Sequence, residues 1–295
     1  ACFSRLLERL PACPGVTRTC PLCVRTLPLR TTRQAILSRT GRVAHVARNT
    51  ARVPCVLIGL WLEWQPFVAR AGNPMTLLHT PLDALHRELG ARMVPFAGYD
   101  MPLQYSGGII HEHLHTRSKA GLFDVSHMGQ LVLAGEGSAA LLESLEPADV
   151  CRLGLHCQTY ALLTNEEGGV LDDLIITRWD EECFFLVVNA ACKADDIAHI
   201  EAHLAGQQLS VLQAQALLAL QGPAARELMR GIAPEAAELT FMHGCKTAID
   251  GVAVYISCSG YTGEDGFELS VPAEAAEQIA RRLLAHAQVE PVGLG

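Results

Sequence analysis

The sequence predicts an α+β fold in which antiparallel sheets are covered by packed helices. Short apolar runs of strand length alternate with helical segments along most of the chain. Several neighbouring runs are joined by glycine-bearing turns, and the repeated strand–crossover–strand rhythm of a doubly wound sheet is missing. With 295 residues, of which 49% are hydrophobic, the chain is long enough to bury a core and to form two domains.

The first 74 residues differ in composition from the rest of the chain. They contain eleven arginines, no lysine and two acidic residues, which gives a charge of +9, whereas the remainder carries −17. Cys20 and Cys23 form a Cys-x-x-Cys pair, but no second pair follows at zinc-ligand spacing. Because residues 1–74 show no sustained helical or strand periodicity, we interpret them as a disordered extension outside the fold. A mitochondrial transit peptide is the first alternative.

The ordered part of the chain begins with a predicted helix. Leu82, Leu85 and Leu89 share one helical face, and Gly90 is placed to end the helix. Residues 93–105 then contain too much proline and glycine for one regular element. We therefore expect an irregular, packed connector there.

Residues 110–120 predict a short helix with many polar side chains. His111, Glu112, His113 and His115 are residue types that bind metals, and we interpret them as the polar face of this helix rather than as a metal site. No metal is therefore expected in this protein.

Asp124, Ser126 and His127 invite comparison with a catalytic triad. They follow one another along a single extended segment, whereas nucleophile, base and orienting acid normally come from separate elements. We therefore predict structural hydrogen bonding for these three side chains.

A hairpin is predicted from residues 160–163 and 171–176, with a glycine turn between them. Asp172 and Asp173 stand at the start of its second strand. Successive strand residues point to opposite faces, so one of these carboxylates is expected to face a core or a cavity. A carboxylate in that position requires a hydrogen-bonding neighbour or a ligand.

The remaining segments continue the alternation of strands and helices. Two strands near the end are expected to pair across a long glycine-bearing loop with Glu264 and Asp265 at its tip. The expected strands are 184–189, 217–221, 252–257 and 267–271, and the expected helices are 138–145, 195–204 and 224–231.

Three motifs together resemble the aminomethyltransferase, or T-protein, family of the glycine cleavage system. They are Phe-Asp-Val-Ser-His-Met at 123–128, Gly-Val-Leu-Asp-Asp-Leu at 169–174 and Gly-Tyr-Thr-Gly-Glu-Asp-Gly at 260–266. Segments 95–105, 220–223 and 292–295 are similar to the family in the same order and spacing. The resemblance covers residues 75–295 and leaves 1–74 outside.

The resemblance implies a particular division of the chain. Residues 75–124 and 213–295 would form a first folate-binding α+β domain, and residues 125–212 an inserted ferredoxin-like α+β domain. The family continues beyond Gly-Leu-Gly into an arginine-bearing segment and a β-barrel. Because the sequence stops there, we expect the first domain to be incomplete, the barrel to be missing and this chain by itself to be inactive.

The resemblance also implies an activity and a site. The family transfers the methylene carbon from the aminomethyl-dihydrolipoyl arm of the H-protein to tetrahydrofolate and releases ammonia. Asp173 matches the carboxylate beside the reactive nitrogens, where its charge would orient the amine or stabilise a developing cation. Glu264 matches the acceptor for the paired N–H donors of the pterin. The other positions that match the folate pocket are Met128, Tyr160, Val187 and Asn189.

Two other functions remain open on the sequence. Proteins of this fold also serve as non-catalytic folate binders in iron–sulfur maturation, with a Lys-Gly-Cys-Tyr-x-Gly-Gln signature that is missing here, and as folate-dependent demethylases. The expected partners are the lipoylated H-protein and tetrahydrofolate, without nucleic acid, membrane or metal; the −17 charge of residues 75–295 would repel phosphates. With eleven cysteines and no secretory signal, we expect reduced thiols and a cytoplasmic protein, or the mitochondrial matrix if residues 1–74 act as a transit peptide.

Overall fold

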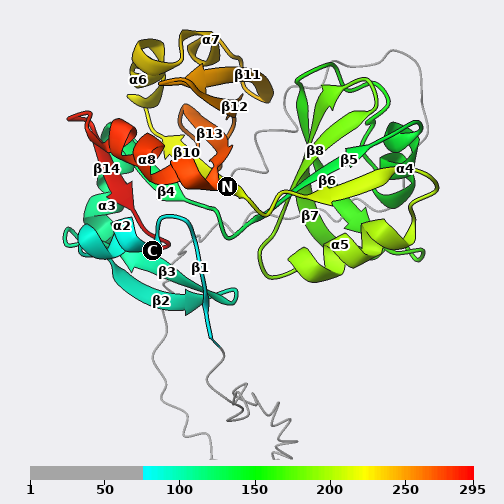
Figure 1. Cartoon of the computed structure of the whole chain (residues 1–295), viewed down its shortest axis with the longest axis horizontal. Helices are drawn as coiled ribbons and strands as arrows, with labels where there is room; N and C mark the ends of the chain where they lie inside the picture. Colours follow the sequence, from blue (N-terminus) through cyan, green and yellow to red (C-terminus); the bar gives the residue numbers. More distant parts are fainter. Residues whose placement is uncertain (1–75) are drawn as a thin grey trace, which may run out of the picture. The chain divides into compact units, whose positions relative to one another are not determined.

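The computed structural model describes residues 76–295, so the predictions for residues 1–74 lie outside the described part. These residues form three sheets of three, six and five strands, with helices packed beside them (Figure 1). The predicted α+β class is confirmed. Most strand pairs are antiparallel, but β1 pairs with β3 and β14 with β4 in parallel. No helix in residues 76–295 is long and apolar enough to span a membrane.

The three-stranded sheet includes the segment that was predicted to be irregular. Its strands are β1 (Leu78–His79), β2 (Arg92–Phe96) and β3 (Tyr99–Gln104), in the order β1-β3-β2. The predicted connector at 93–105 is wrong, because β2 and β3 form an antiparallel hairpin. Its two-residue turn has positive φ at Ala97 (47°) and Gly98 (82°), as such tight hairpins require. Pro95 is tolerated because β2 is an edge strand.

Two helices flank this sheet in the sequence. The predicted first helix is confirmed as α2 (Asp83–Glu88), and Gly90 follows it with φ 76°. The second is α3 (Ile109–Ser118), also as predicted. Its polar side chains are not simply a solvated face, because Glu112 and His115 are buried. The sequence interpretation of this helix was therefore incomplete.

The six-stranded sheet has the order β11-β12-β13-β10-β4-β14. The predicted pairing of the last two long strands across a glycine-bearing loop is confirmed by β12 and β13. Apolar side chains from this sheet and from α2, α6, α7 and α8 form the larger core cluster. The bounds are β4 (Ala120–Asp124), β10 (Gln215–Gln221), α6 (Ala225–Ile232), α7 (Pro234–Ala237), β11 (His243–Ile249), β12 (Val252–Cys258), β13 (Gly266–Pro272), η2 (Ala273–Ala275), α8 (Ala276–Leu284) and β14 (Val289–Val292).

The five-stranded sheet is built from the middle of the chain, in the order β6-β7-β8-β5-β9. Leu142 of α4 and Ile200 of α5 pack with strand residues in the second core cluster, so both helices cover one face of this sheet (Figure 1). The predicted hairpin is confirmed as β6 and β7. The domain limits at 124, 125, 212 and 213 stay a prediction. The bounds are β5 (Gly129–Ala134), α4 (Ser138–Leu145), β6 (Gln158–Thr164), β7 (Val170–Asp180), β8 (Cys183–Val188), α5 (Lys193–Ala202) and β9 (Gln208–Val211).

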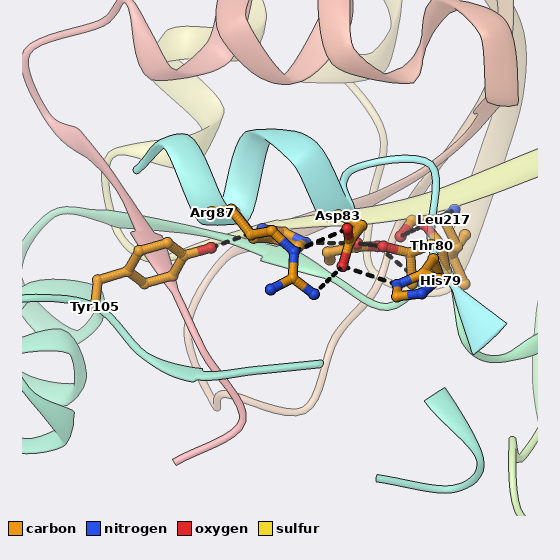
Figure 2. Close-up of polar contacts among 9 residues, drawn as sticks. His79, Thr80, Asp83, Arg87, Tyr105 and Leu217 are labelled. Atoms are coloured by element: carbon orange, nitrogen blue, oxygen red, sulfur yellow. Dashed lines mark hydrogen bonds and ion pairs between the residues drawn. The ribbon is translucent and has the colours of Figure 1, made fainter. Parts of the chain in front are cut away.

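Asp124, at the end of β4, is the centre of a buried hydrogen-bond network. Its Oδ2 accepts bonds from Thr80 Oγ1 at 2.6 Å and from His86 Nε2 at 2.8 Å. The other ring nitrogen of His86 lies 2.9 Å from the hydroxyl of Tyr105. Figure 2 shows Thr80 and Tyr105 at opposite ends of this network. The network joins α2 to β4.

The predicted structural role holds for two of the three residues that resembled a triad. Asp124 Oδ1 accepts the backbone N–H of Ser126 at 2.9 Å, and the Ser126 hydroxyl exchanges hydrogen bonds with the backbone of Leu217. The buried Nδ1 of His127 has no hydrogen-bond partner in residues 76–295, and its ring instead packs edge-on against Phe96. For Nδ1 of His127 the prediction was wrong.

Candidate functional site

Asp173 stands on the face of the five-stranded sheet that the helices leave open. In the strand register Leu162 lies opposite Asp173, and Tyr160 opposite Ile175. Directly opposed residues share a face, and alternate residues along a strand do so as well. Tyr160, Asp173 and Val187 therefore lie on one face, which we call the Asp173 face. The aspartate itself is exposed.

Asn189 is fixed against both aspartates of the motif. Its side-chain amide lies 3.1 Å from Asp173 Oδ1, 3.0 Å from the Asp173 carbonyl and 3.1 Å from Asp172 Oδ1. One amide group has two hydrogens, so these three acceptors share them. The contact brings together two sequence-predicted residues, Asp173 and Asn189, and leaves the second oxygen of Asp173 free for another donor.

Asp172 points away from the Asp173 face toward α5. Its Oδ2 is buried without a partner in the described residues, and so is Oδ2 of Asp196 on that helix. Burial and then the hydrogen bond with Asp172 together raise the pKa of Asp196 to about 7. Asp196 therefore keeps its proton up to near-neutral pH. The predicted split of the two carboxylates between opposite faces is confirmed, and Asp172 is the partly buried one of the two.

The apolar floor beside Asp173 is formed by residues of β7 and β8. Ile175, Phe185 and Val187 form a small buried cluster, and Met128 packs against it. Tyr160 is 45% exposed at the margin of this floor. Its ring centroid lies 5.7 Å from that of Tyr261, in the loop before β13. An apolar surface with polar groups at its edge suits a flat ring system.

The two acids at the tip of the β12–β13 loop are held by arginines. Arg117 binds Glu264 at 2.8 Å and donates to the carbonyl of Thr262 at 2.7 Å. Arg226 binds Asp265 through two nitrogens at 2.5 and 2.7 Å. The carboxylate of Glu264 is therefore already paired with a cation. Its role as pterin acceptor stays a prediction.

Glu268 is an acid of the same hairpin that the sequence interpretation missed. It is half-buried on β13 and accepts a bond from Ser259 Oγ at 2.9 Å. Desolvation raises the pKa of Glu268, and the bond from Ser259 offsets part of that shift. The pKa of Tyr261 is raised first by desolvation of its hydroxyl and then by neighbours that include Glu268 and Asp173. The two carboxylates therefore lie near Tyr261.

A signal for Glu268 existed in the sequence. It stands on a strand in which Phe267 and Leu269 are fully buried, so strand alternation places Glu268 on the opposite face. That this face meets Tyr160 depends on how the two sheets pack, which no local pattern reports.

The arrangement combines acceptors with an aromatic and apolar floor. Asp173 and Glu268 can each accept hydrogen bonds, and Tyr160 and Tyr261 add a pair of exposed aromatic rings near them. No metal-ligand cluster of three residues includes any of these groups among residues 76–295. Such a site favours a planar heterocycle with several N–H donors, or a cationic group.

Comparison with known proteins identifies the family of this chain. The family model described as the GCVT N-terminal domain matches residues 82–295. The chain belongs to this family. Among GCVT-domain relatives, a probable mitochondrial aminomethyltransferase of Schizosaccharomyces pombe is 42% identical over 226 residues, which are 75% of this chain and 58% of that protein. The mitochondrial aminomethyltransferase of Gallus gallus is 43% identical over 229 residues, with 75% and 58% covered.

A solved structure shows the same fold for this GCVT-domain chain. The crystal structure of the glycine cleavage system aminomethyltransferase T from Bartonella henselae is 42% identical and superimposes with a TM-score of 0.69, covering 74% of this chain and 60% of that one. The chain thus spans about 60% of the length of the relatives that it matches. The resemblance found in the sequence motifs is confirmed.

Proposed function

We propose that this chain supplies the folate-binding part of an aminomethyltransferase of the glycine cleavage system. The observation that carries the proposal is the gathering of two carboxylates, Asp173 and Glu268, near the paired rings of Tyr160 and Tyr261. Relatives that are named aminomethyltransferases support the reaction class. The lipoylated H-protein would deliver the aminomethyl group, and tetrahydrofolate would supply the nitrogens that take up its carbon.

Each residue would contribute a separate physical effect. Asp173 would place negative charge where positive charge develops as ammonia departs, and Asn189 would hold that carboxylate in one orientation. Glu268 would accept the paired N–H donors of the pterin, with Ser259 fixing its second oxygen. Tyr160, Val187 and Met128 would exclude water from the ring. Glu264 could join them only if Arg117 released it.

Calorimetry with tetrahydrofolate on the whole chain tests the binding step. Glu268→Gln is expected to weaken binding about 10- to 100-fold, because one hydrogen-bonded charge is lost. Asp173→Asn should weaken it less, since Asp173 is placed to stabilise charge that develops during the reaction, whereas Glu268 would bond the pterin itself. Glu167→Gln, an exposed acid in the β6–β7 turn, is the matched control and should bind as the parent chain does. Equal affinity in the parent and in both site variants would contradict the proposal.

The two remaining folate functions share this binding step with the proposal. Binding of the lipoylated H-protein to the chain separates them, because a demethylase or a non-catalytic folate protein would not use that partner. For the compartment, the names of the Schizosaccharomyces pombe and Gallus gallus relatives favour the mitochondrial alternative over the cytoplasmic prediction.

A further inference from the structure

Two histidines and one glutamate converge where α3 meets β14. His111 and His115 are four residues apart, so they stand on successive turns of one helix face. His111 Nε2 lies 2.7 Å from Glu290 Oε2, and His115 Nδ1 lies 3.1 Å from Glu290 Oε1. One ligand atom from each of the three side chains lies within 4.8 Å of the others. This cluster is separate from the Asp173 face.

The hydrogen bonding of His115 leaves its Nδ1 facing the Glu290 carboxylate. The side chain is only 4% exposed, and Nε2 lies 3.1 Å from the carbonyl oxygen of Gln288. A carbonyl only accepts, so Nε2 carries a hydrogen, and Nδ1 is the ring nitrogen that faces the Glu290 carboxylate. The position between Nδ1 and the carboxylate oxygen suits a proton or a metal ion. Metal-binding histidines typically have this arrangement, with the distal N–H on a backbone carbonyl.

We propose that His111, His115 and Glu290 bind a divalent transition metal, with Zn²⁺ as the best match. Two imidazoles and one carboxylate form a donor set that Zn²⁺ commonly uses. Neighbouring ligand atoms around tetrahedral zinc are about 3.3 Å apart, given bonds of about 2.0–2.1 Å. The observed separations of 2.7 and 3.1 Å need only small rotations to reach that spacing. His111 and Glu290 are 55% and 40% exposed, which leaves the fourth position to water.

In a second cluster of similar composition, the carboxylates are already neutralised by an arginine. His79, Asp83 and Asp100 also gather potential ligand atoms within 4.8 Å. Arg87 already binds there, with Nε 3.0 Å from Asp83 and a terminal nitrogen 2.5 Å from Asp100, and Figure 2 shows its guanidinium beside Asp83. The guanidinium neutralises these carboxylates, so an added cation would gain little. Among residues 76–295, no cationic side chain is paired with Glu290 except the two histidines themselves.

The bound ion would join two segments that are distant in the sequence. The contact between His111 and Glu290 spans 179 positions. Glu290 lies on β14, whose following residues line a cavity of about 240 Å³ together with Asp124. Metal binding would therefore link α3 to the edge strand of the six-stranded sheet. This link would not depend on folate binding.

Equilibrium dialysis of the whole chain against Zn²⁺ tests the site, with bound zinc counted per chain. His111→Ala and Glu290→Gln change exposed groups, and each is expected to lose one equivalent relative to the parent. His113→Ala is the matched control, since this exposed histidine of the same helix faces away from the cluster and should retain all equivalents. Counting the difference removes any contribution from Cys20 and Cys23.

Visible spectroscopy with Co²⁺ gives a second readout. The parent chain and His113→Ala should show the absorption of a four-coordinate cobalt site, and that component should be missing from His111→Ala and Glu290→Gln. The proposal is overturned if all four proteins bind the same number of zinc equivalents, or if His113→Ala loses as much metal as the two site variants.

Discussion

At the scale of single residues, Asp196, which lies beside Asp172 of the motif, makes the stability of the chain depend on pH. It is 3% exposed, and its pKa is raised to about 7 by desolvation and by Asp172. Between about pH 4 and 7 the folded chain therefore keeps a proton that the unfolded chain has released. The native state binds more protons in that window, so this residue makes the free energy of unfolding fall as the pH rises.

Asp196→Asn should remove that pH dependence. The amide imitates the protonated acid, so the variant is expected to match the parent near pH 4 and to be more stable above pH 7 by on the order of 2 kcal/mol. Urea unfolding at pH 4.5, 6 and 8 measures the difference. Asp195→Asn, at the neighbouring exposed position, is the control and should leave the pH slope nearly unchanged. A constant difference at all three values would contradict the raised pKa of Asp196.

The contribution of Asp124 to the free energy of unfolding should change with pH in the opposite direction. Burial alone would raise its pKa, but the hydrogen bonds from His86, Ser126 and Thr80 hold the pKa below its ordinary value. The stability from this carboxylate is thus present above about pH 4 and is lost as the pH falls through the lowered pKa. Asp124→Ala is expected to cost about 3–5 kcal/mol at pH 7, because His86 loses its buried partner.

Chemical denaturation checks this cost, with Glu227→Ala as the comparison. Glu227 is 74% exposed in its pair with Arg230, and removing it should change the free energy of unfolding by less than about 1 kcal/mol. Similar small effects in both variants would show that the Asp124 network contributes little.

At the scale of elements, the loop before β13 depends on close approaches around Gln221. Its side chain donates to the Ser259 carbonyl at 2.9 Å and accepts from Thr262 Oγ1 at 3.0 Å. A side chain at Gly260 or Gly266 would collide with it, at 2.0 and 2.3 Å. The glycines of the loop motif are thus explained by the buried amide on β10 rather than by the turn alone.

Gly222, which directly follows β10, stands where the backbone leaves no room for a side chain. It has φ 131°, and a Cβ would lie 2.3 Å from the carbonyl oxygen of Lys119. Gly222→Ala is expected to destabilise the chain by about 2–4 kcal/mol through strain and overpacking. Gly231→Ala is the opposite control, because this helical glycine of α6 has open space around it and should gain about 0.5–1 kcal/mol. Thermal unfolding of both variants tests whether their effects differ in sign.

The elements that could be predicted from the sequence are those with a local signal. The β6–β7 hairpin and α2 follow from apolar periodicity and from glycines at their ends. The β2–β3 hairpin was missed because prolines on its strands suggested a break, whereas Pro95 lies at the edge where its lost N–H does no harm. Asp173 was identified from a motif, but its contact with Asn189 depends on pairing between β7 and β8. Glu268 depends on sheet packing, which leaves no local pattern.

At the scale of the whole molecule, the open face of the five-stranded sheet packs against the six-stranded sheet. Ser270 of β13 donates to Gln130 of β5 at 2.6 Å in a buried position. The ring of Trp179 stacks on Phe185 at 4.7 Å and also lies 5.0 Å from Tyr255. The position of Asp173 relative to Glu268 therefore depends on this packing between the two sheets.

Phe185→Ala should weaken that packing. The side chain is 3% exposed, and its removal is expected to cost about 3–5 kcal/mol through lost burial and a cavity. Because the same cluster forms the floor of the Asp173 face, tetrahydrofolate binding should weaken as well. Phe241→Ala, at a position 59% exposed, should change stability by less than about 0.5 kcal/mol. Denaturant unfolding with folate calorimetry on both variants gives the comparison.

The buried Glu112 of α3 has a consequence for the rate of folding. One oxygen accepts the N–H of Tyr105 at 2.6 Å, and the other accepts the N–H of Gly293 at 2.9 Å, across 181 positions of sequence. Contacts of such high sequence separation form late and slow the search for the native state. Until β14 docks, the outer edge of β4 has unpaired backbone groups that can recruit a strand from another molecule. Refolding yield should therefore fall steeply with protein concentration during the interval before this last strand is in place.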